Sequence, residues 1–363
     1  MVYAENTWLS NEEYLMEFNK KSAQLRIPLS GSLALTHRCN LSCVHCYIRD
    51  HSNNMLHKEM SAKKILSLID EITEAGCLHF LITGGDPLLR EDFSEIYSRA
   101  KRNGLLVTVF TNGTLITDRI LELFENLPPR AVEISLYGAT ASTYEKITGV
   151  PGSYEKCVNG IRLLLDHKIY LRLKTVLMTY NNQEFYEIEN MAKDYGVKFR
   201  FDAAIFPRFN GDKSALSLRV SPQEAIEKEF SDEYRARQWE KYFKRTQGQL
   251  LSNNLYNCGA GVTCFHIDPY GNLQPCLMTT NIKYNLLKSS FLTGWRNIVS
   301  GISDKKAGKT FSCNQCEKLH LCGVCPAFFE LENGSEYILS EYLCALGNYR
   351  FQLIHNENLL RVS

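Results

Sequence analysis

The sequence predicts an α/β protein: a partial barrel of six parallel strands followed by a small cysteine-rich domain. From Ser32 to Ala203, short apolar runs alternate with longer amphipathic ones, which is typical of repeated strand and helix units around a parallel sheet. From Cys258 to Cys344 the chain is instead rich in Gly, Asn and Cys. Such a composition is expected where bound metal, rather than a broad apolar core, stabilises the fold.

Strands and helices are expected to alternate along the first part of the chain. The helical stretches include residues 61–76 and 153–168, where apolar residues recur at spacings of three and four. Parallel-strand enzymes carry their chemistry at the carboxyl ends of the strands, so the loops that follow the strands are the candidate site. The six strands are expected at residues 32–37, 78–83, 105–110, 131–137, 170–178 and 197–203.

The domain organisation follows from these patterns. A polar, charged segment over residues 221–249 predicts helices that bridge the two parts. The expected regions are an amino-terminal extension (1–30), the partial barrel (31–210), a bridging helical segment (211–250), a cluster-binding domain (251–350) and a carboxy-terminal helix (351–363).

Charge and hydropathy exclude several partners. A formal charge of +1 gives no overall field that favours nucleic acid or anionic membranes. The first thirty residues lack an apolar stretch of signal-peptide length, and no run of about twenty apolar residues could span a bilayer. We therefore expect a cytoplasmic protein with no nucleic-acid or membrane partner. In that reducing compartment its thirteen cysteines are expected to hold metal rather than form disulfides.

Three cysteines lie on one loop directly after the first expected strand: Cys39, Cys43 and Cys46, in a CxxxCxxC arrangement. Three thiolates can hold three irons of a cubane and leave the fourth iron open for another ligand. The alternative is a zinc site completed by His37 or His45. Structural zinc, however, normally takes four protein ligands in paired CxxC or CxxH units. The strand-end position favours a catalytic cluster.

This loop, with Tyr47 after the third cysteine, resembles the defining motif of the radical S-adenosylmethionine (SAM) superfamily. The turn Gly84-Gly85-Asp86-Pro87 after the second strand resembles the family's turn that binds the amino group of the methionine moiety. The resemblance also implies that Lys174 meets the cofactor carboxylate, where the family often has Arg. The implied SAM contacts are Tyr47, Gly84, Gly85, Asp86, Asn112, Ser135 and Lys174.

The later cysteines resemble the SPASM domain, which binds two auxiliary clusters. Cys258, Gly271 and Cys276 fit its first part, but only two residues separate Cys322 from Cys325 where the family typically has three. A pair of zinc ribbons is the alternative. Cys77 and Cys157 remain outside these motifs and are expected to be buried and dispensable. The resemblance implies one cluster on Cys258, Cys264, Cys276 and Cys325 and a second on Cys313, Cys316, Cys322 and Cys344.

The resemblance implies a radical SAM oxidoreductase with three [4Fe-4S] clusters. Reductive cleavage of SAM would give a 5′-deoxyadenosyl radical, and the auxiliary clusters would carry electrons away from an oxidised substrate. Relatives of this type mostly modify peptides or proteins, so we expect a peptide substrate, for example for thioether or carbon crosslinking. A flavodoxin or ferredoxin would be the electron donor. Only about thirty residues precede the first strand, too few for a winged-helix module that grips a leader peptide.

Three other activities stay open. Sulfatase maturases, which oxidise a Cys or Ser, usually carry an acid at the position of Leu277; here Asp202, near the end of the sixth strand, is the candidate base. A tetrapyrrole decarboxylase would need basic residues, and Arg200 and Arg208 are candidates to meet propionates. The third alternative is a non-enzymatic electron carrier, which the open three-cysteine site argues against.

Overall fold

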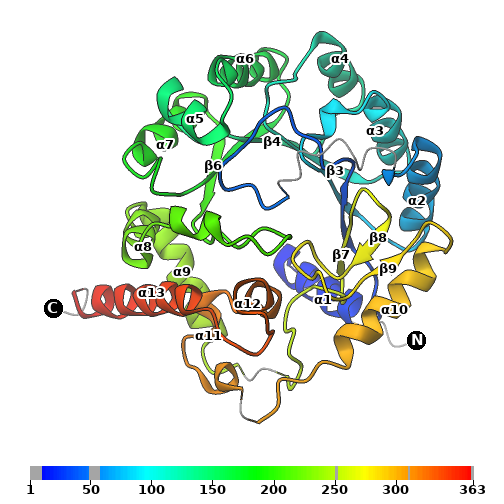
Figure 1. The fold of residues 1–363 in the computed structure, drawn as a ribbon. Coiled ribbons are helices and arrows are strands. Elements are labelled where there is room, and N and C mark those ends of the chain that lie inside the picture. The colour runs from blue at the N-terminus through cyan, green and yellow to red at the C-terminus, as the bar shows by residue number, and fades with distance from the viewer. Residues whose placement is uncertain (1–9, 49–57, 250–251, 310, 361–363) are drawn as a thin grey trace, which may run out of the picture.

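The structure is a computed structural model that describes residues 10–48, 58–249, 252–309 and 311–360. It confirms the predicted α/β fold, a parallel strand core with helices on its outside (Figure 1). No helix in these ranges is both long and apolar enough to cross a lipid bilayer. The strands are β1 (Ser30–Ala34), β2 (His79–Thr83), β3 (Leu106–Thr111), β4 (Ala131–Ser135), β5 (Leu171–Val176), β6 (Lys198–Asp202), β7 (Cys264–Ile267), β8 (Asn272–Gln274) and β9 (Tyr284–Asn285).

Several helices begin at a serine that caps them. Ser61, Ser221 and Ser290 each accept a backbone N–H at the start of a helix, which satisfies a donor that has no partner inside the helix. The α-helices are α1 (Asn11–Gln24), α2 (Ala62–Glu74), α3 (Phe93–Arg102), α4 (Asp118–Asn126), α5 (Ala141–Thr148), α6 (Ser153–Asp166), α7 (Phe185–Asp194), α8 (Pro222–Phe230), α9 (Glu233–Thr246), α10 (Phe291–Ser303), α11 (Leu319–Cys322), α12 (Pro326–Asn333) and α13 (Glu341–Leu360).

The sheet has nine strands in the order β6-β5-β4-β3-β2-β1-β7-β8-β9. The six predicted strands are present, although β1 starts two residues earlier than expected, at Ser30. The cysteine-rich region adds the other three: β7 pairs in parallel with β1, with Cys264 opposite Ser30, and β8 and β9 follow antiparallel. This region therefore extends the edge of the barrel sheet, which sequence analysis did not predict.

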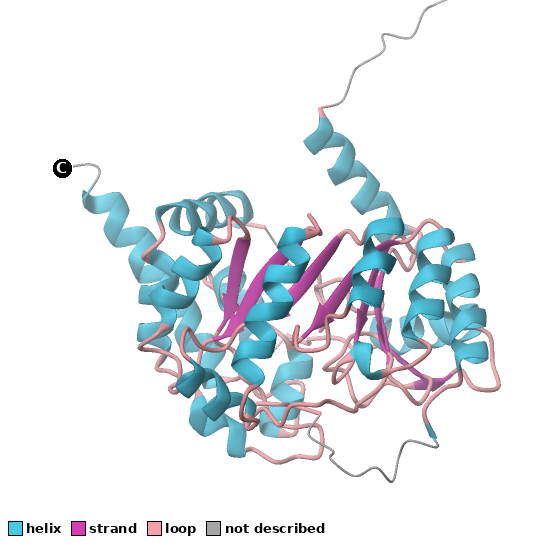
Figure 2. Ribbon diagram, turned by 90° about the horizontal axis from the view of Figure 1, so that it is seen from above, coloured by secondary structure: helices cyan, strands magenta, loops and turns pink. Residues whose placement is uncertain are grey.

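The bridging segment forms two helices, α8 and α9, and the carboxy-terminal helix begins at Glu341, ten residues earlier than expected. Helix α13 packs against α8, α9 and α11. Side chains of α8, α12 and α13 contribute to a second apolar core beside the end of β6, which includes Ile226, Phe328 and Leu343. Burial of such side chains is the main favourable term that joins the two parts. Figure 2 shows the strands side by side with helices around them, and α1 projecting from the body.

Candidate active site

The loop with the first three cysteines follows β1 and is fixed to the end of α5. The backbone N–H groups of Ser42 and Val44 donate to the carbonyl oxygens of Thr148 and Ile147 over 2.8 and 2.9 Å. Within the loop, the N–H of Cys46 donates to the carbonyl oxygen of Cys43 over 3.1 Å. These bonds fix the loop backbone, and with it the three cysteines, at the carboxyl end of the barrel strands.

The glycine turn is joined to the same loop, and this is why it needs glycine. The N–H of Gly85 donates to the carbonyl of Thr36 over 2.8 Å, and that of Asp86 to the carbonyl of Arg38 over 2.9 Å. A Cβ on Gly84 would lie 2.4 Å from the oxygen of Thr36, and one on Gly85 2.1 Å from that of Arg38. The two glycines therefore allow one backbone to pack directly on another, as well as lining the cavity described below.

The carboxylate of Asp86 is turned into the protein rather than into the cavity. It is fully buried and accepts hydrogen bonds from the hydroxyl of Thr111 (2.7 Å) and the N–H groups of Asn112 (2.8 Å) and Leu88 (3.0 Å). Burial raises the pKa of Asp86, and the three hydrogen bonds oppose that rise. Asp86 thus connects the loops after β2 and β3. Unlike the other implied SAM contacts, it does not line the cavity.

The other implied SAM contacts surround one cavity of about 330 Å³, within the usual size range of small-molecule sites. Three cysteines of the first loop line it, as does Asp202. Asn112 also touches the loop, because its side-chain amide donates to the Sγ of Cys39 over 3.7 Å. The implied contacts that line the cavity are Tyr47, Gly84, Gly85, Asn112, Ser135 and Lys174.

Lys174 is a half-buried cation in the wall of this cavity. Its Nζ lies 3.1 Å from the centre of the Phe110 ring, and no ion pair within 4.0 Å joins it to a described carboxylate. The nearby carboxylate of Glu133 is occupied by the guanidinium groups of Arg200 (2.8 Å) and Arg172 (3.5 Å). Burial, and then Arg200, lower the pKa of Lys174 to about 7. An anionic group in the cavity would stabilise its charged form.

The donor set fits the implied cofactors. Burial raises the pKa of Cys39 to about 11 and also raises the pKa of Cys43, so these thiols need a bound cation to become thiolates. The buried Nδ1 atom of His45, also in the cavity wall, has no hydrogen-bond partner among the described residues. Soft thiolate ligands in one wall and a half-buried lysine in another match an iron–sulfur cluster with SAM.

The eight later cysteines fall into two sets. In the first set, burial is the larger cause of the raised pKa values and like-charge interaction adds to it. Cys276 raises the pKa of Cys258 and of Cys264 in this way, and Cys276 and Cys258 raise that of Cys325. In the second set, Cys313 interacts in the same way with Cys322, Cys344 and Cys316. These interactions agree with the two groups that the resemblance implies, while Cys77 also interacts with Cys264 in this way.

The short spacing between Cys322 and Cys325 is accommodated by Gly323. This residue ends α11 in the left-handed region, at φ 67°, so the chain turns between the two cysteines and directs them to different sets. Among the described residues, no three His, Cys, Asp or Glu side chains converge closely enough to hold a single metal ion. A cubane distributes its thiolates over separate irons, so it does not require that convergence.

Arg208, a candidate for binding propionates, is used inside the protein. It is 9% exposed and pairs with Asp212, and its guanidinium donates to the carbonyl oxygens of Val44 (3.0 Å) and Cys46 (3.2 Å). The prediction that it meets a substrate is therefore wrong, because its donors are already occupied. Arg200 does line the cavity, paired with Glu133.

Sequence reasoning missed Glu133 and Phe206. Glu133 is a buried acid within the apolar run of β4, and that interruption was the available signal. The ring of Phe206 lies 5.2 Å from that of Tyr47 and 6.1 Å from that of Phe328 on α12, so it bridges the first loop and the cysteine-rich region. Nothing in the local sequence distinguishes Phe206 from an ordinary core residue.

Comparisons with known proteins agree with this site. Residues 33–194 match the radical SAM superfamily. Over 335 residues the chain is 26% identical to an AdoMet-dependent heme synthase of Methanosarcina barkeri (strain Fusaro / DSM 804), covering 85% of this chain and 94% of the synthase. It is 27% identical over 268 residues to the antilisterial bacteriocin subtilosin biosynthesis protein AlbA of Bacillus subtilis (strain 168), covering 71% of this chain and 56% of AlbA.

The fold is similar to that of Streptococcus suis SuiB in its crystal structure with the precursor peptide SuiA. The TM-score is 0.71 at 17% sequence identity, and the match covers 94% of this chain and 84% of SuiB. At that identity the likeness concerns the fold alone. Residues 33–194 are therefore a radical SAM domain, and this chain is an enzyme that carries this domain followed by a cysteine-rich carboxy-terminal region.

Proposed function

We propose that this enzyme holds three [4Fe-4S] clusters and oxidatively modifies a peptide or protein substrate. The observation that carries the proposal is the arrangement of eleven cysteines in three groups. Cys39, Cys43 and Cys46 line the cavity that also contains Lys174, and the two sets of four lie in the carboxy-terminal region. Three thiolates leave one iron open for SAM, whereas four thiolates complete a cluster.

When bound, the first cluster would supply the electron that cleaves SAM into methionine and a 5′-deoxyadenosyl radical, and the auxiliary clusters would accept the electron that the substrate loses after hydrogen abstraction. The protein's own residues would bind SAM and orient it. Lys174 would pair with the carboxylate of SAM, and the backbone of Gly84 and Gly85 would contact its amino group. Asp202, exposed at the cavity wall, would accept the proton that the substrate loses on oxidation.

The peptide substrate is supported by the relatives. AlbA is named for bacteriocin biosynthesis, and SuiB was crystallised with a precursor peptide. Reduction of the first cluster would need a partner such as a flavodoxin or ferredoxin. Leu277, which follows Cys276 where sulfatase maturases usually have an acid, makes that activity the weaker alternative among peptide oxidations.

Tetrapyrrole decarboxylation is the second candidate, and the heme synthase relative favours it. Arg200 could meet a propionate in the cavity, although its guanidinium is held by Glu133. Arg208 no longer supports this activity, because it is bound to the cysteine loop.

One experiment separates the two. The anaerobically reconstituted enzyme is incubated with SAM and dithionite, either with short peptides encoded beside its gene or with a tetrapyrrole that bears carboxylate side chains. If the enzyme modifies a peptide, the amount of 5′-deoxyadenosine formed should be proportional to the amount of peptide product that has lost two hydrogens. Loss of carbon dioxide from the tetrapyrrole, with the peptides unchanged, would contradict the proposal.

A further inference from the structure

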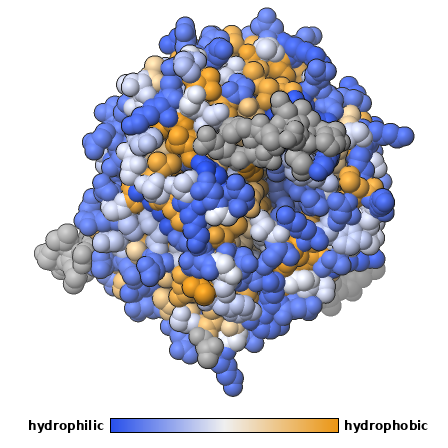
Figure 3. Space-filling view, in the orientation of Figure 1, coloured by the Kyte–Doolittle hydropathy of each residue, from blue (hydrophilic) through white to orange (hydrophobic). Residues whose placement is uncertain are grey.

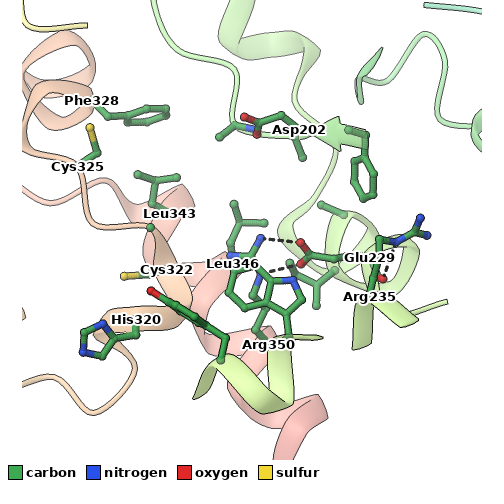
Figure 4. Close-up of a pocket in the computed structure, with 18 of the residues that line it drawn as sticks. Asp202, Glu229, Arg235, His320, Cys322, Cys325, Phe328, Leu343, Leu346 and Arg350 are labelled. Carbon is green, nitrogen blue, oxygen red and sulfur yellow. Dashed lines mark hydrogen bonds and ion pairs between the residues drawn. The ribbon is translucent and has the colours of Figure 1, made fainter. Parts of the chain in front are cut away.

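A second cavity, of about 660 Å³, lies between the end of β6 and the cysteine-rich region. Its walls come from β6, α8, α9, α11, α12 and α13, so it exists only because the bridging and carboxy-terminal helices pack beside the barrel. Figure 4 shows Asp202 on one side of this space and Phe328, Cys325 and His320 on the other. We call it the large cavity and the one that contains Lys174 the small cavity.

The two cavities share a wall. Asp202, Ala204 and Phe206 line both of them. A molecule in the large cavity therefore lies next to the place where the radical would form, separated from it by three side chains. The large cavity also borders both sets of later cysteines, through Cys322 of one and Cys325 of the other. Figure 3 shows a hollow on the face of the molecule seen in Figure 1, bordered by both apolar and hydrophilic surface.

The lining of the large cavity is mainly apolar and aromatic. Ile226, Trp239, Phe328, Leu343 and Leu346 contribute to it from four helices. One polar group in it lacks a partner: the Nε2 atom of His320 is buried and has no hydrogen-bond partner among the described residues. A buried polar atom of this kind costs free energy unless a ligand or water satisfies it. A peptide backbone offers both a donor and an acceptor for that purpose.

The charges of the large cavity limit what it can bind. Arg350 pairs with Glu229 at 2.6 Å, and Arg235 pairs with Glu189, so both arginines are neutralised. The carboxylate of Asp202 accepts the N–H of Ala204 over 2.8 Å and forms no ion pair with a described residue. A ligand with several carboxylates would find no unpaired arginine or lysine in this lining and would face Asp202. A neutral or basic ligand would not be repelled by Asp202.

We propose that the large cavity binds the substrate peptide as an apolar or aromatic segment of neutral or positive charge, whose reacting residue passes Asp202, Ala204 and Phe206 into the small cavity. This inference rests on the proposed function and names its substrate class. Apolar side chains of the peptide pack against Trp239, Leu343 and Leu346, and a basic side chain lies near Asp202.

The test measures binding rather than turnover. Two fluorescein-labelled nonapeptides alternate Leu and Phe with either Lys or Glu, and fluorescence anisotropy records their affinity for the reconstituted enzyme with SAM. Gln238→Trp adds bulk at an exposed residue of α9 that lines the large cavity. Arg237→Trp, the adjacent exposed residue outside the lining, is the matched control. Asp202→Lys reverses the charge at the shared wall.

The lysine peptide is expected to bind at least about tenfold more tightly than the glutamate peptide. Gln238→Trp should weaken binding by about tenfold, Arg237→Trp should leave it unchanged, and Asp202→Lys should reverse the preference. Equal affinity of the two tryptophan variants, or no binding of either peptide by the unmodified enzyme, would overturn the inference. The inference would also be overturned if a carboxylate-bearing porphyrin binds the unmodified enzyme and Gln238→Trp abolishes that binding.

Iron content and 5′-deoxyadenosine formation are measured on the same samples. If both match the unmodified enzyme while peptide affinity does not respond to Gln238→Trp, the inference fails and the proposed function stands. If the unmodified enzyme lacks the auxiliary irons, the proposed function itself fails.

Discussion

Arg208 donates a hydrogen bond from its Nε to the carbonyl oxygen of Cys46 over 3.2 Å. The next residue, Phe209, donates its N–H to the carbonyl of Tyr47 over 3.0 Å. Further along, the guanidinium of Arg219 donates to the carbonyl of Ile205 and pairs with Glu332 on α12 at 2.6 Å. The segment 205–219 therefore holds the first cysteine loop at one end and the carboxy-terminal helices at the other.

Arg208→Ala is expected to loosen the cysteine loop and reduce cluster content. It leaves the carbonyl groups of Val44 and Cys46 without these donors and Asp212 without its cation. Iron analysis and EPR after anaerobic reconstitution should show loss of the first cluster's signal, with partial recovery in Arg208→Lys. Arg237→Ala, an exposed arginine on α9, is the control and should behave like the unmodified enzyme. A full first-cluster signal in Arg208→Ala would contradict this role.

Lys174→Met is expected to weaken SAM binding and to change its pH dependence. With its pKa lowered to about 7, Lys174 loses its charge as pH rises above neutrality, so SAM affinity of the unmodified enzyme should fall between about pH 6.5 and 9. The variant should bind SAM about tenfold more weakly at pH 6.5, without that decline. Equilibrium dialysis with SAM measures both. Equal affinities at pH 6.5 would remove Lys174 from the SAM site.

The lowered pKa of Lys174 also predicts that the stability of the protein changes with pH. The unfolded chain holds the Lys174 proton up to its ordinary pKa of 10.5, whereas the folded chain releases it near 7. Between these values the unfolded state binds more protons, so stability contributed by this residue rises with pH. Lys174→Met should raise the melting temperature at pH 6 more than at pH 9. The opposite order would mean that folding raises the pKa of Lys174 instead of lowering it.

Asp86→Ala is expected to destabilise the protein and to lower SAM affinity together. The substitution leaves the donors of Thr111, Asn112 and Leu88 unsatisfied in a buried place, at a cost of about 1–3 kcal/mol. Thermal denaturation should show a lower melting temperature. Asp92→Ala is the comparison. It removes an acid that pairs with Arg90 and whose own side chain is 26% exposed, so it should have a smaller effect. Unchanged SAM affinity would separate Asp86 from the cofactor cavity.

Cys77→Ala and Cys157→Ala are expected to keep the full iron content. Both thiols are buried, near the carbonyl oxygens of Leu29 and Ser135 respectively, and neither belongs to the three cysteine groups. Iron analysis of each variant should therefore equal that of the unmodified protein, with only a modest loss of thermal stability. A loss of about four irons in either variant would change the cluster assignment.

The strands of the barrel could be predicted because their signals are local. Each short apolar run stands between turn or helix signals, and four of the six observed strands lie within the residues expected for them, while β1 and β3 extend beyond by two residues and one residue. Strands β7 to β9 could not be predicted, because they are only two to four residues long and depend on pairing with β1. Such short strands carry almost no periodicity.

The candidate site was predictable where a motif forces several residues onto one loop. The three cysteines and the glycine turn are of this kind. The sequence could not show which way a side chain points: Asp86 turns into the protein, and Arg208 is used by the cysteine loop rather than by a ligand. Nor could it show the large cavity, whose walls come from six elements between residues 201 and 350.

The most direct test counts iron. The protein is reconstituted anaerobically beside a variant with Cys39, Cys43 and Cys46 all changed to alanine, and iron, sulfide and EPR spectra are measured for both. With three clusters, the unmodified protein should contain about twelve irons per chain and the variant about eight, and the variant should not cleave SAM. Only about four irons in the unmodified protein, or stoichiometric zinc in place of iron, would contradict the three-cluster mechanism.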